Sequence, residues 1–348
     1  DGVLGKGAGI LYRLARLALV DQVVPELDRV VLHEYFGHGA RAREFGWPAS
    51  YGIGAPPPLG DGGGHTAMDI PRAADVTVTQ SLALSSAGME ANDVARDRLA
   101  RRWVSSGDLT YQEAVRYLLA RYDQLGYIYG SGTGEGDDVE AYAEALNAAS
   151  GTTVSDPEYA SGATFQKQAW VGLLDPLSLY ALYGVLAAHV VDGRDTLGVP
   201  MLRVAGLRYL PALGYSLTPV GPEFHSVHRL RAGGRGLTVD LRLGDGRLGR
   251  TWGVSAATVD AWRSGRLGLD LRAALWDQPR FSLDGEAGSG SGPRPGGLLS
   301  VRARWRFGRP RAGLQLSGLI LELGYKTRGY LRGERLDRGL VIRGGMGL

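Results

Sequence analysis

The chain of 348 residues contains no cysteine. Disulfide bridges and metal sites built from thiolates are therefore excluded. No segment that combines positive charge with a following apolar run remains at the N-terminus, so we expect that a secretion signal has been removed. The length suits one large domain or two domains of moderate size.

Long uninterrupted apolar segments are also missing. The most apolar stretch, residues 169–191, is about long enough to cross a bilayer. Asp175 and Pro176 divide it and leave a continuous helix of only about 15 residues. This length predicts a buried or membrane-abutting helix, and it disfavours an inner-membrane protein built from spanning helices.

The first half of the chain has few basic residues, and the second half has few acidic ones. Residues 1–200 contain 15 Lys and Arg against 25 Asp and Glu, whereas residues 201–348 contain 24 against 11. This split predicts two domains with these boundaries in different environments. The arginines of the second half alternate with apolar residues, so we assign them to strands and expect no nucleic-acid partner.

The second half has the alternation typical of antiparallel strands. Leu299 and Val301 fall on one face of a predicted strand, and Arg302 and Arg304 fall on the other. Gly- and Asp-rich turns separate about eight such segments. The same alternation recurs in residues 237–243 and 267–275.

The last ten residues, GLVIRGGMGL, alternate up to Leu348. They resemble the C-terminal signature strand of bacterial outer-membrane barrels. The resemblance implies an α+β protein with a helical half and an antiparallel, transmembrane, β-barrel-like half that contacts membrane lipid in the bacterial outer membrane. Side chains fill an eight-stranded barrel, so the helices would sit to one side, or the barrel would contain more strands or close by oligomerising.

The first half has helical periodicity. We expect a helix over residues 25–46 and another that begins after Thr110, which is placed to cap it. A strand is predicted over residues 76–84. Acidic residues crowd the start of a later helix, where we expect them to complement the helix dipole and not to form a calcium loop: Asp137, Asp138 and Glu140.

The stretch VVLHEYFGHGARAREFG, residues 30–46, holds His33, Glu34 and His38. On a regular helix, residues five apart differ by about 140° in direction, so the two imidazoles would diverge. A π-type bulge absorbs one extra residue and realigns them, and Gly37 supplies backbone freedom for it. On a regular helix, Glu34 and His38 would be the only pair able to share a ligand.

This stretch resembles the active-site helix of zincin-type metallopeptidases, H-E-x-x-H, with one residue inserted. The small residues, the basic residue and the Phe-Gly that follow look most like the site-2-protease form. The resemblance implies a Zn²⁺ ion held by His33 and His38, with Glu34 as the catalytic general base.

A catalytic zinc ion needs a third protein ligand. In the gluzincin scheme Glu90 supplies it, and Asp93, one turn later, orients a histidine from behind the ligands. In the site-2-protease scheme the candidate is Asp175, and His65, in a glycine-rich loop, is a further one.

Two functional classes follow from these patterns. The first is an outer-membrane-associated zinc metallopeptidase-like hydrolase that acts on a protein or peptide substrate. The second is a non-catalytic outer-membrane β-barrel, a structural or assembly subunit in a membrane complex or oligomer, whose histidine cluster is vestigial. His225 and His228, three apart on a predicted strand, are expected to line the rim or lumen of the barrel and not to bind metal.

Overall fold

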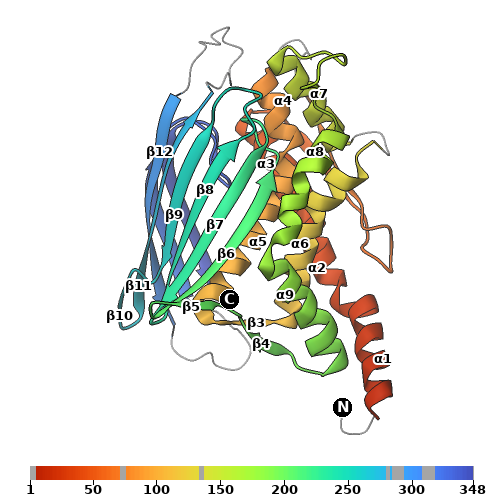
Figure 1. Cartoon of the computed structure of the whole chain (residues 1–348), viewed down its shortest axis with the longest axis vertical. Helices are drawn as coiled ribbons and strands as arrows, with labels where there is room; N and C mark the ends of the chain where they lie inside the picture. Colours follow the sequence, from red (N-terminus) through yellow and green to blue (C-terminus); the bar gives the residue numbers. More distant parts are fainter. Residues whose placement is uncertain are drawn as a thin grey trace.

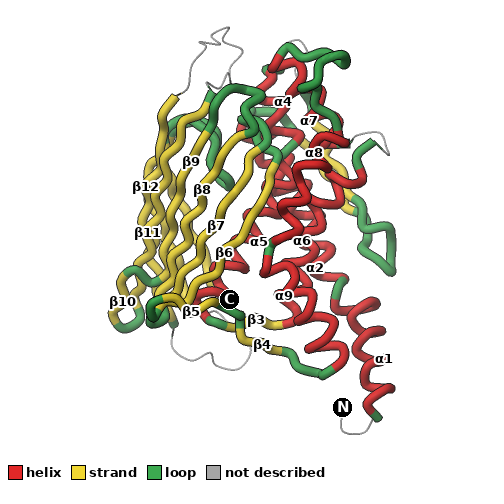
Figure 2. Tube along the Cα trace, viewed as in Figure 1, coloured by secondary structure: helices red, strands yellow, loops and turns green. Residues whose placement is uncertain are grey.

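The computed structural model describes residues 5–70, 76–132, 137–279, 283, 294–307 and 318–347. A helical N-terminal half precedes a large antiparallel sheet, as the sequence predicts (Figure 1). Leu348, the end of the alternating C-terminal pattern, lies outside the described residues. Figure 2 shows the helices gathered against one side of the curved sheet.

The helical half contains α-, π- and 3₁₀-helical segments joined by short strands. In chain order they are α1 (Lys6–Arg16), η1 (Leu17–Asp21), α2 (Val23–Val31), η2 (Leu32–His38), α3 (Gly39–Glu44), β1 (Ala49–Ile53), β2 (Gly64–Met68), α4 (Val78–Ser85), α5 (Ala87–Ser106), β3 (Asp108–Thr110), α6 (Tyr111–Gly130), α7 (Asp138–Ser150), α8 (Gly162–Ala169), η4 (Trp170–Leu174), α9 (Pro176–Tyr183), η5 (Gly184–Val191) and β4 (Thr196–Gly198).

Capping residues explain two of these helix starts. Thr110 forms a capping box with Glu113, which confirms the predicted cap of α6. The strand predicted over residues 76–84 is wrong, because α4 occupies most of that range. Thr77 and Gln80 form a second capping box, and it fixes a helix where alternating Val and Thr suggested a strand.

The sheet of the second half contains ten strands, all paired antiparallel. They are β5 (Leu202–Val204), β6 (Leu207–Ser216), β7 (Glu223–Ala232), β8 (Arg235–Gly244), β9 (Trp252–Val259), β10 (Trp262–Ser264), β11 (Leu267–Gln278), β12 (Arg294–Arg306), β13 (Gly318–Lys326) and β14 (Gly339–Gly347).

The sheet is open. Its order is β14-β13-β12-β11-β9-β8-β7-β6-β5, with β10 paired to β11, so β14 and β5 are edge strands with no partner on their outer side among the described residues. The expected closure into a barrel is therefore wrong. Strand alternation specifies the two faces of a sheet, but it does not specify whether the edges meet.

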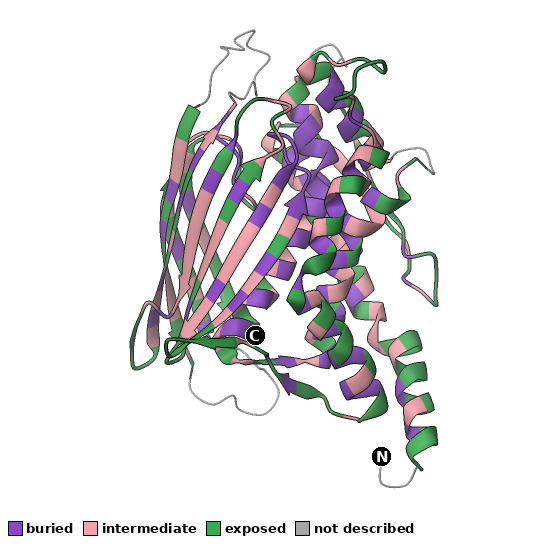
Figure 3. Ribbon diagram, viewed as in Figure 1, coloured by how far each residue is buried: buried purple, intermediate pink, exposed green. Residues whose placement is uncertain are grey.

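The two faces of the sheet differ as the alternation predicts. Leu299 on β12 is 64% exposed and Ile342 on β14 is 66% exposed, whereas Ser300 is buried. In Figure 3, exposed and less exposed positions alternate along the strands. The apolar face points outward and the polar face points toward α5, which packs against β7 and β8.

Two apolar clusters form the core of the helical half, around Trp103 and Tyr117 and around Tyr142 and Phe165. Among the described residues, no single helix is long and apolar enough to cross a bilayer. One pair, Gly162–Leu174 and Pro176–Val191, meets the length and composition criteria together but is bent by 65°.

Candidate metal centre

The helix that contains His33 and His38, called the motif helix below, carries the predicted π-type bulge. A π-helical segment, η2, runs from Leu32 to His38 between the α-helical segments α2 and α3. In a π-helix the backbone bond joins residues five apart, so side chains at that spacing lie one above the other. His33 and His38 therefore converge, as a metal site that uses both histidines requires.

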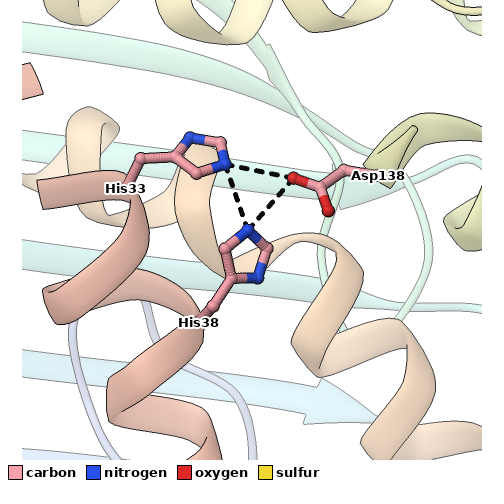
Figure 4. Close-up of side chains that lie close together, drawn as sticks. All are labelled: His33, His38 and Asp138. Atoms are coloured by element: carbon pink, nitrogen blue, oxygen red, sulfur yellow. Dashed lines mark hydrogen bonds and ion pairs between the residues drawn. The ribbon is translucent and has the colours of Figure 1, made fainter. Parts of the chain in front are cut away.

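The two imidazoles meet the carboxylate of Asp138, which was predicted to complement a helix dipole and not to bind metal. His33 Nε2 lies 3.0 Å from His38 Nε2, and each of these atoms lies 3.1 Å from Asp138 Oδ2. The three atoms form a nearly equilateral triangle (Figure 4). The three side chains are a group that could hold a metal ion, and His33 and His38 are buried.

Asp138 reaches this position from the first turn of α7. Its neighbour Asp137 is the N-cap and accepts hydrogen bonds from the backbone N–H groups of Val139 and Glu140. The expectation that these acids serve the helix terminus holds for Asp137 but does not describe Asp138. Spacing along the chain gave no signal, since about 100 residues separate Asp138 from His38.

Each imidazole is oriented through its second nitrogen. His33 Nδ1 lies 3.0 Å from Asp123 Oδ2 on α6, and His38 Nδ1 lies 2.9 Å from the carbonyl oxygen of Leu84. Arg29 donates to the other oxygen of Asp123 at 2.6 Å and holds this carboxylate in place. Such outer contacts fix the tautomer and direct Nε2 toward the shared centre.

The charges at the centre are strongly coupled. Burial lowers the pKa of His33, but the carboxylates of Asp123 and Asp138 outweigh it and raise the pKa to about 10. Burial raises the pKa of Asp138, whereas His38 and His33 lower it well below its usual range. The two carboxylates therefore favour the protonated form of the His33 imidazole.

Small residues let α5 approach the motif helix closely. A Cβ atom at Gly88 would lie 2.2 Å from His33 Nε2, and one at Gly37 would lie 2.6 Å from the carbonyl oxygen of Ala87. Neither position can hold a larger side chain without displacing its neighbour. Gly37 thus has a packing role in addition to any role in the helix distortion.

The donor set fits zinc. Tetrahedral bonds of 2.0–2.1 Å place ligand atoms about 3.3–3.4 Å apart, so the observed triangle would need to widen by only about 0.3 Å. Two imidazole nitrogens and one carboxylate oxygen are ligand types that zinc accepts. Three protein ligands, the number found among the described residues, are typical of catalytic sites.

Glu34 lies under the β1–β2 hairpin. It is 5% exposed, and its Oε2 accepts a hydrogen bond from Thr66 Oγ1 at 2.7 Å. The Tyr127 ring stacks on the His33 ring with 4.6 Å between centroids. Burial raises the pKa of Tyr127, and the charges of Asp138, Asp123 and Glu34 raise it further. Glu34 is therefore within electrostatic range of the ring that covers His33.

The other ligand candidates lie in different surroundings. Glu90 Oε2 accepts from Arg41 at 2.8 Å and its Oε1 accepts from the backbone N–H of Gly333. Asp175 caps α9 and accepts from the Tyr117 hydroxyl at 2.6 Å. The structure brings neither carboxylate into the group formed by the histidines and Asp138.

The other residues considered from sequence also lie outside the group formed by His33, His38 and Asp138. Asp93 lies 2.8 Å from Arg96 and accepts from Ser216, so Asp123 takes the orienting role that was expected of Asp93. His65 is an exposed residue of β2. On the sheet, His225 contacts Asp240 and His228 contacts Tyr209.

A scan against protein-family models, a search of curated proteins and a search of solved structures each found no match.

Proposed function

We propose that the protein is an outer-membrane-associated zinc hydrolase that cleaves a peptide or related amide bond. His33, His38 and Asp138 would hold the metal ion. The observation that carries the proposal is the convergence of their three ligand atoms within about 3 Å of one another, with both histidines oriented by second contacts.

The residues around the centre suit amide hydrolysis. Bound zinc supplies Lewis-acid chemistry, polarising a carbonyl group and lowering the pKa of water. Glu34, adjacent to a ligand and held by Thr66, would accept a proton from the attacking water and return it to the leaving nitrogen. Tyr127 limits access to the His33 face of the centre.

The outward apolar face of the sheet supports a membrane location. Its exposed residues lie at paired positions on neighbouring strands, so they form a continuous surface of a kind that is rare on soluble monomers. Helices add further exposed apolar side chains. The exposed set includes Leu11, Leu14, Leu179, Leu182, Leu299, Val301, Leu321, Leu323, Leu340, Ile342 and Met346.

A second candidate is a non-catalytic membrane protein with a structural charge network. The observation in its favour is that the two nitrogens of His33 each lie within hydrogen-bonding distance of a carboxylate, so these side chains can satisfy one another directly. In that protein the pair of imidazoles and Asp138 would stabilise the junction of η2, α6 and α7. Measured metal content separates the two candidates.

The test uses purified protein in detergent. Wild type and His65→Ala, the matched control, should contain about one zinc per chain by elemental analysis, and His38→Ala should contain much less. Glu34→Gln should keep its zinc and lose hydrolysis of a fluorogenic peptide library. Equal zinc content in wild type and His38→Ala would exclude the metal centre, and full activity of Glu34→Gln would exclude the general-base role.

A further inference from the structure

The polar face of the sheet and α5 enclose a cavity of ≈ 400 Å³ that is separate from the metal centre. Residues of α5 line one wall, and residues of β8, β9, β11, β12, β13 and β14 line most of the other. Nine arginines and four carboxylates contribute to this lining. Arginines therefore outnumber carboxylates in the lining of this cavity, inside the curve of the sheet.

Most of these arginines are neutralised by carboxylates. Arg302 pairs with Glu322, Arg304 with Asp270, and Arg332 with Asp97. Further ion pairs use carboxylates outside the lining: Arg102–Glu113, Arg242–Glu223, Arg272–Glu334 and Arg343–Glu334. Seven of the nine arginines thus have a carboxylate partner, with Arg272 and Arg343 sharing Glu334. The other two have no such ion pair among the described residues.

These two arginines are Arg98 and Arg101, one turn apart on α5. No hydrogen bond or ion pair is found for either guanidinium within the described part of the chain. Arg272 and Arg302 are near enough to act electrostatically on both. Glu322 acts on Arg98 and Asp97 acts on Arg101, but near each guanidinium three arginines oppose that one carboxylate. A bound dianion would relieve this repulsion.

A third guanidinium at the cavity wall lacks hydrogen-bond acceptors. Arg242 is 2% exposed, and none of its three nitrogens has an acceptor among the described residues. Its carboxylate partner, Glu223, is 3.7 Å away, beyond hydrogen-bonding distance. Both oxygens of Glu223 also lack a hydrogen-bond donor among the described residues, so this ion pair is loose and Arg242 keeps donors free for a further ligand.

The cavity can be reached from the side of the motif helix. Val94, Arg98 and Gly333 line both this cavity and a neighbouring groove between η2 and α5. Arg98 is exposed and borders both spaces, so an anion in the groove can reach this side chain.

We propose that this cavity binds a phosphate group, with Arg98 and Arg101 as its principal contacts. A phosphate carries a charge of about −1.5 to −2 at neutral pH, which matches these two guanidinium groups. Arginine binds phosphate oxygens in a bidentate manner, and arginines one helical turn apart can share one phosphate. The phosphate belongs either to a lipid headgroup or to a soluble anion.

The test is calorimetric titration of the protein in non-ionic detergent with inorganic phosphate and, separately, with phosphatidic acid in mixed micelles. The double variant Arg98→Gln/Arg101→Gln should bind at least about tenfold more weakly than wild type. The control Arg116→Gln/Arg194→Gln removes the same charge from exposed positions on the helical half and should bind as wild type does.

Zinc content of the double variant equal to that of wild type would show that the helical half is intact. Binding of inorganic phosphate by wild type would identify a soluble anion as sufficient, and binding of phosphatidic acid alone would identify a lipid headgroup. The proposal is overturned if wild type binds neither probe, or if the double variant binds both as tightly as wild type.

Discussion

Gly88 decides how closely α5 approaches the imidazole of His33. In Gly88→Ala the new methyl group would lie 2.2 Å from Nε2, so the ring must move and the ligand triangle must open. We expect zinc content to fall sharply and the protein to lose about 1–3 kcal/mol of stability. Gly7→Ala, where nothing lies within 4 Å, is the control for elemental analysis and thermal unfolding. Wild-type zinc content in Gly88→Ala would contradict the packing described.

Asp123 orients the imidazole of His33, one of the proposed zinc ligands. Asp123→Asn keeps the size of the side chain but removes the charge that orients Nδ1, so we expect zinc to bind about 10–100-fold more weakly. Competition with a chromogenic chelator measures this change. Asp156→Asn, at an exposed loop position, should leave the affinity unchanged. Equal zinc affinities of Asp123→Asn and Asp156→Asn would show that Asp123 has no role in zinc binding.

The raised pKa of His33 gives metal binding a pH dependence. At neutral pH the metal-free imidazole is protonated, because its pKa is about 10, and metal binding must expel that proton. The apparent affinity should therefore rise with pH, by about tenfold per pH unit for each proton released. Calorimetry in two buffers of different ionisation enthalpy counts the protons. Identical heats of zinc binding in the two buffers would argue against a protonated His33 imidazole before zinc binds.

At the residue level, local sequence identified part of the centre. His33, Glu34 and His38 stand within six positions, and helix geometry relates their directions directly. Asp138 and Asp123 come from separate helices, and only tertiary packing brings them to the histidines. Glu90 was a reasonable ligand from its helix position, but a buried arginine, Arg41, occupies its carboxylate.

At the scale of the element, η2 can be tested by shortening it. Deletion of Phe36, an exposed residue, yields the regular spacing H-E-Y-G-H. Residues four apart on an α-helix differ by about 40°, so both imidazoles should still converge and zinc should still bind. Deletion of Val31 is the contrasting change, since it rotates both histidines by about 100° relative to α2. Elemental analysis should find zinc in the first variant and not in the second.

Periodicity predicted the strands better than it predicted their assembly. The alternation in β8, β11 and β12 correctly gave the exposed and buried faces. It failed at α4, where a capping box overrides the β-branched pattern. Whether a sheet closes depends on strand number, stagger and packing partners, here including α5 against the polar face, and none of these is encoded in alternation.

On the scale of the whole molecule, the outward apolar face should govern association with bilayers. Leu323→Arg places a charge on that face within β13, where insertion would cost about 2–4 kcal/mol. We expect weaker co-flotation with lipid vesicles. Val154→Arg changes an exposed apolar residue of the helical half and should float as wild type does. Equal flotation of both variants would count against lipid contact through the sheet.

The order of the elements along the chain predicts the order in which they assemble. All groups of the metal centre lie between residues 33 and 138, whereas the large sheet begins at Leu202. That sheet is a meander, so its hairpins can form one after another from local contacts. The loop before β14 is made late in synthesis. In this loop the carbonyl oxygen of Glu334 accepts a hydrogen bond from Arg41, and the backbone N–H of Gly333 donates one to Glu90. A newly made chain can thus assemble the candidate metal centre first and fasten the helix that carries His33 and His38 to the sheet afterwards.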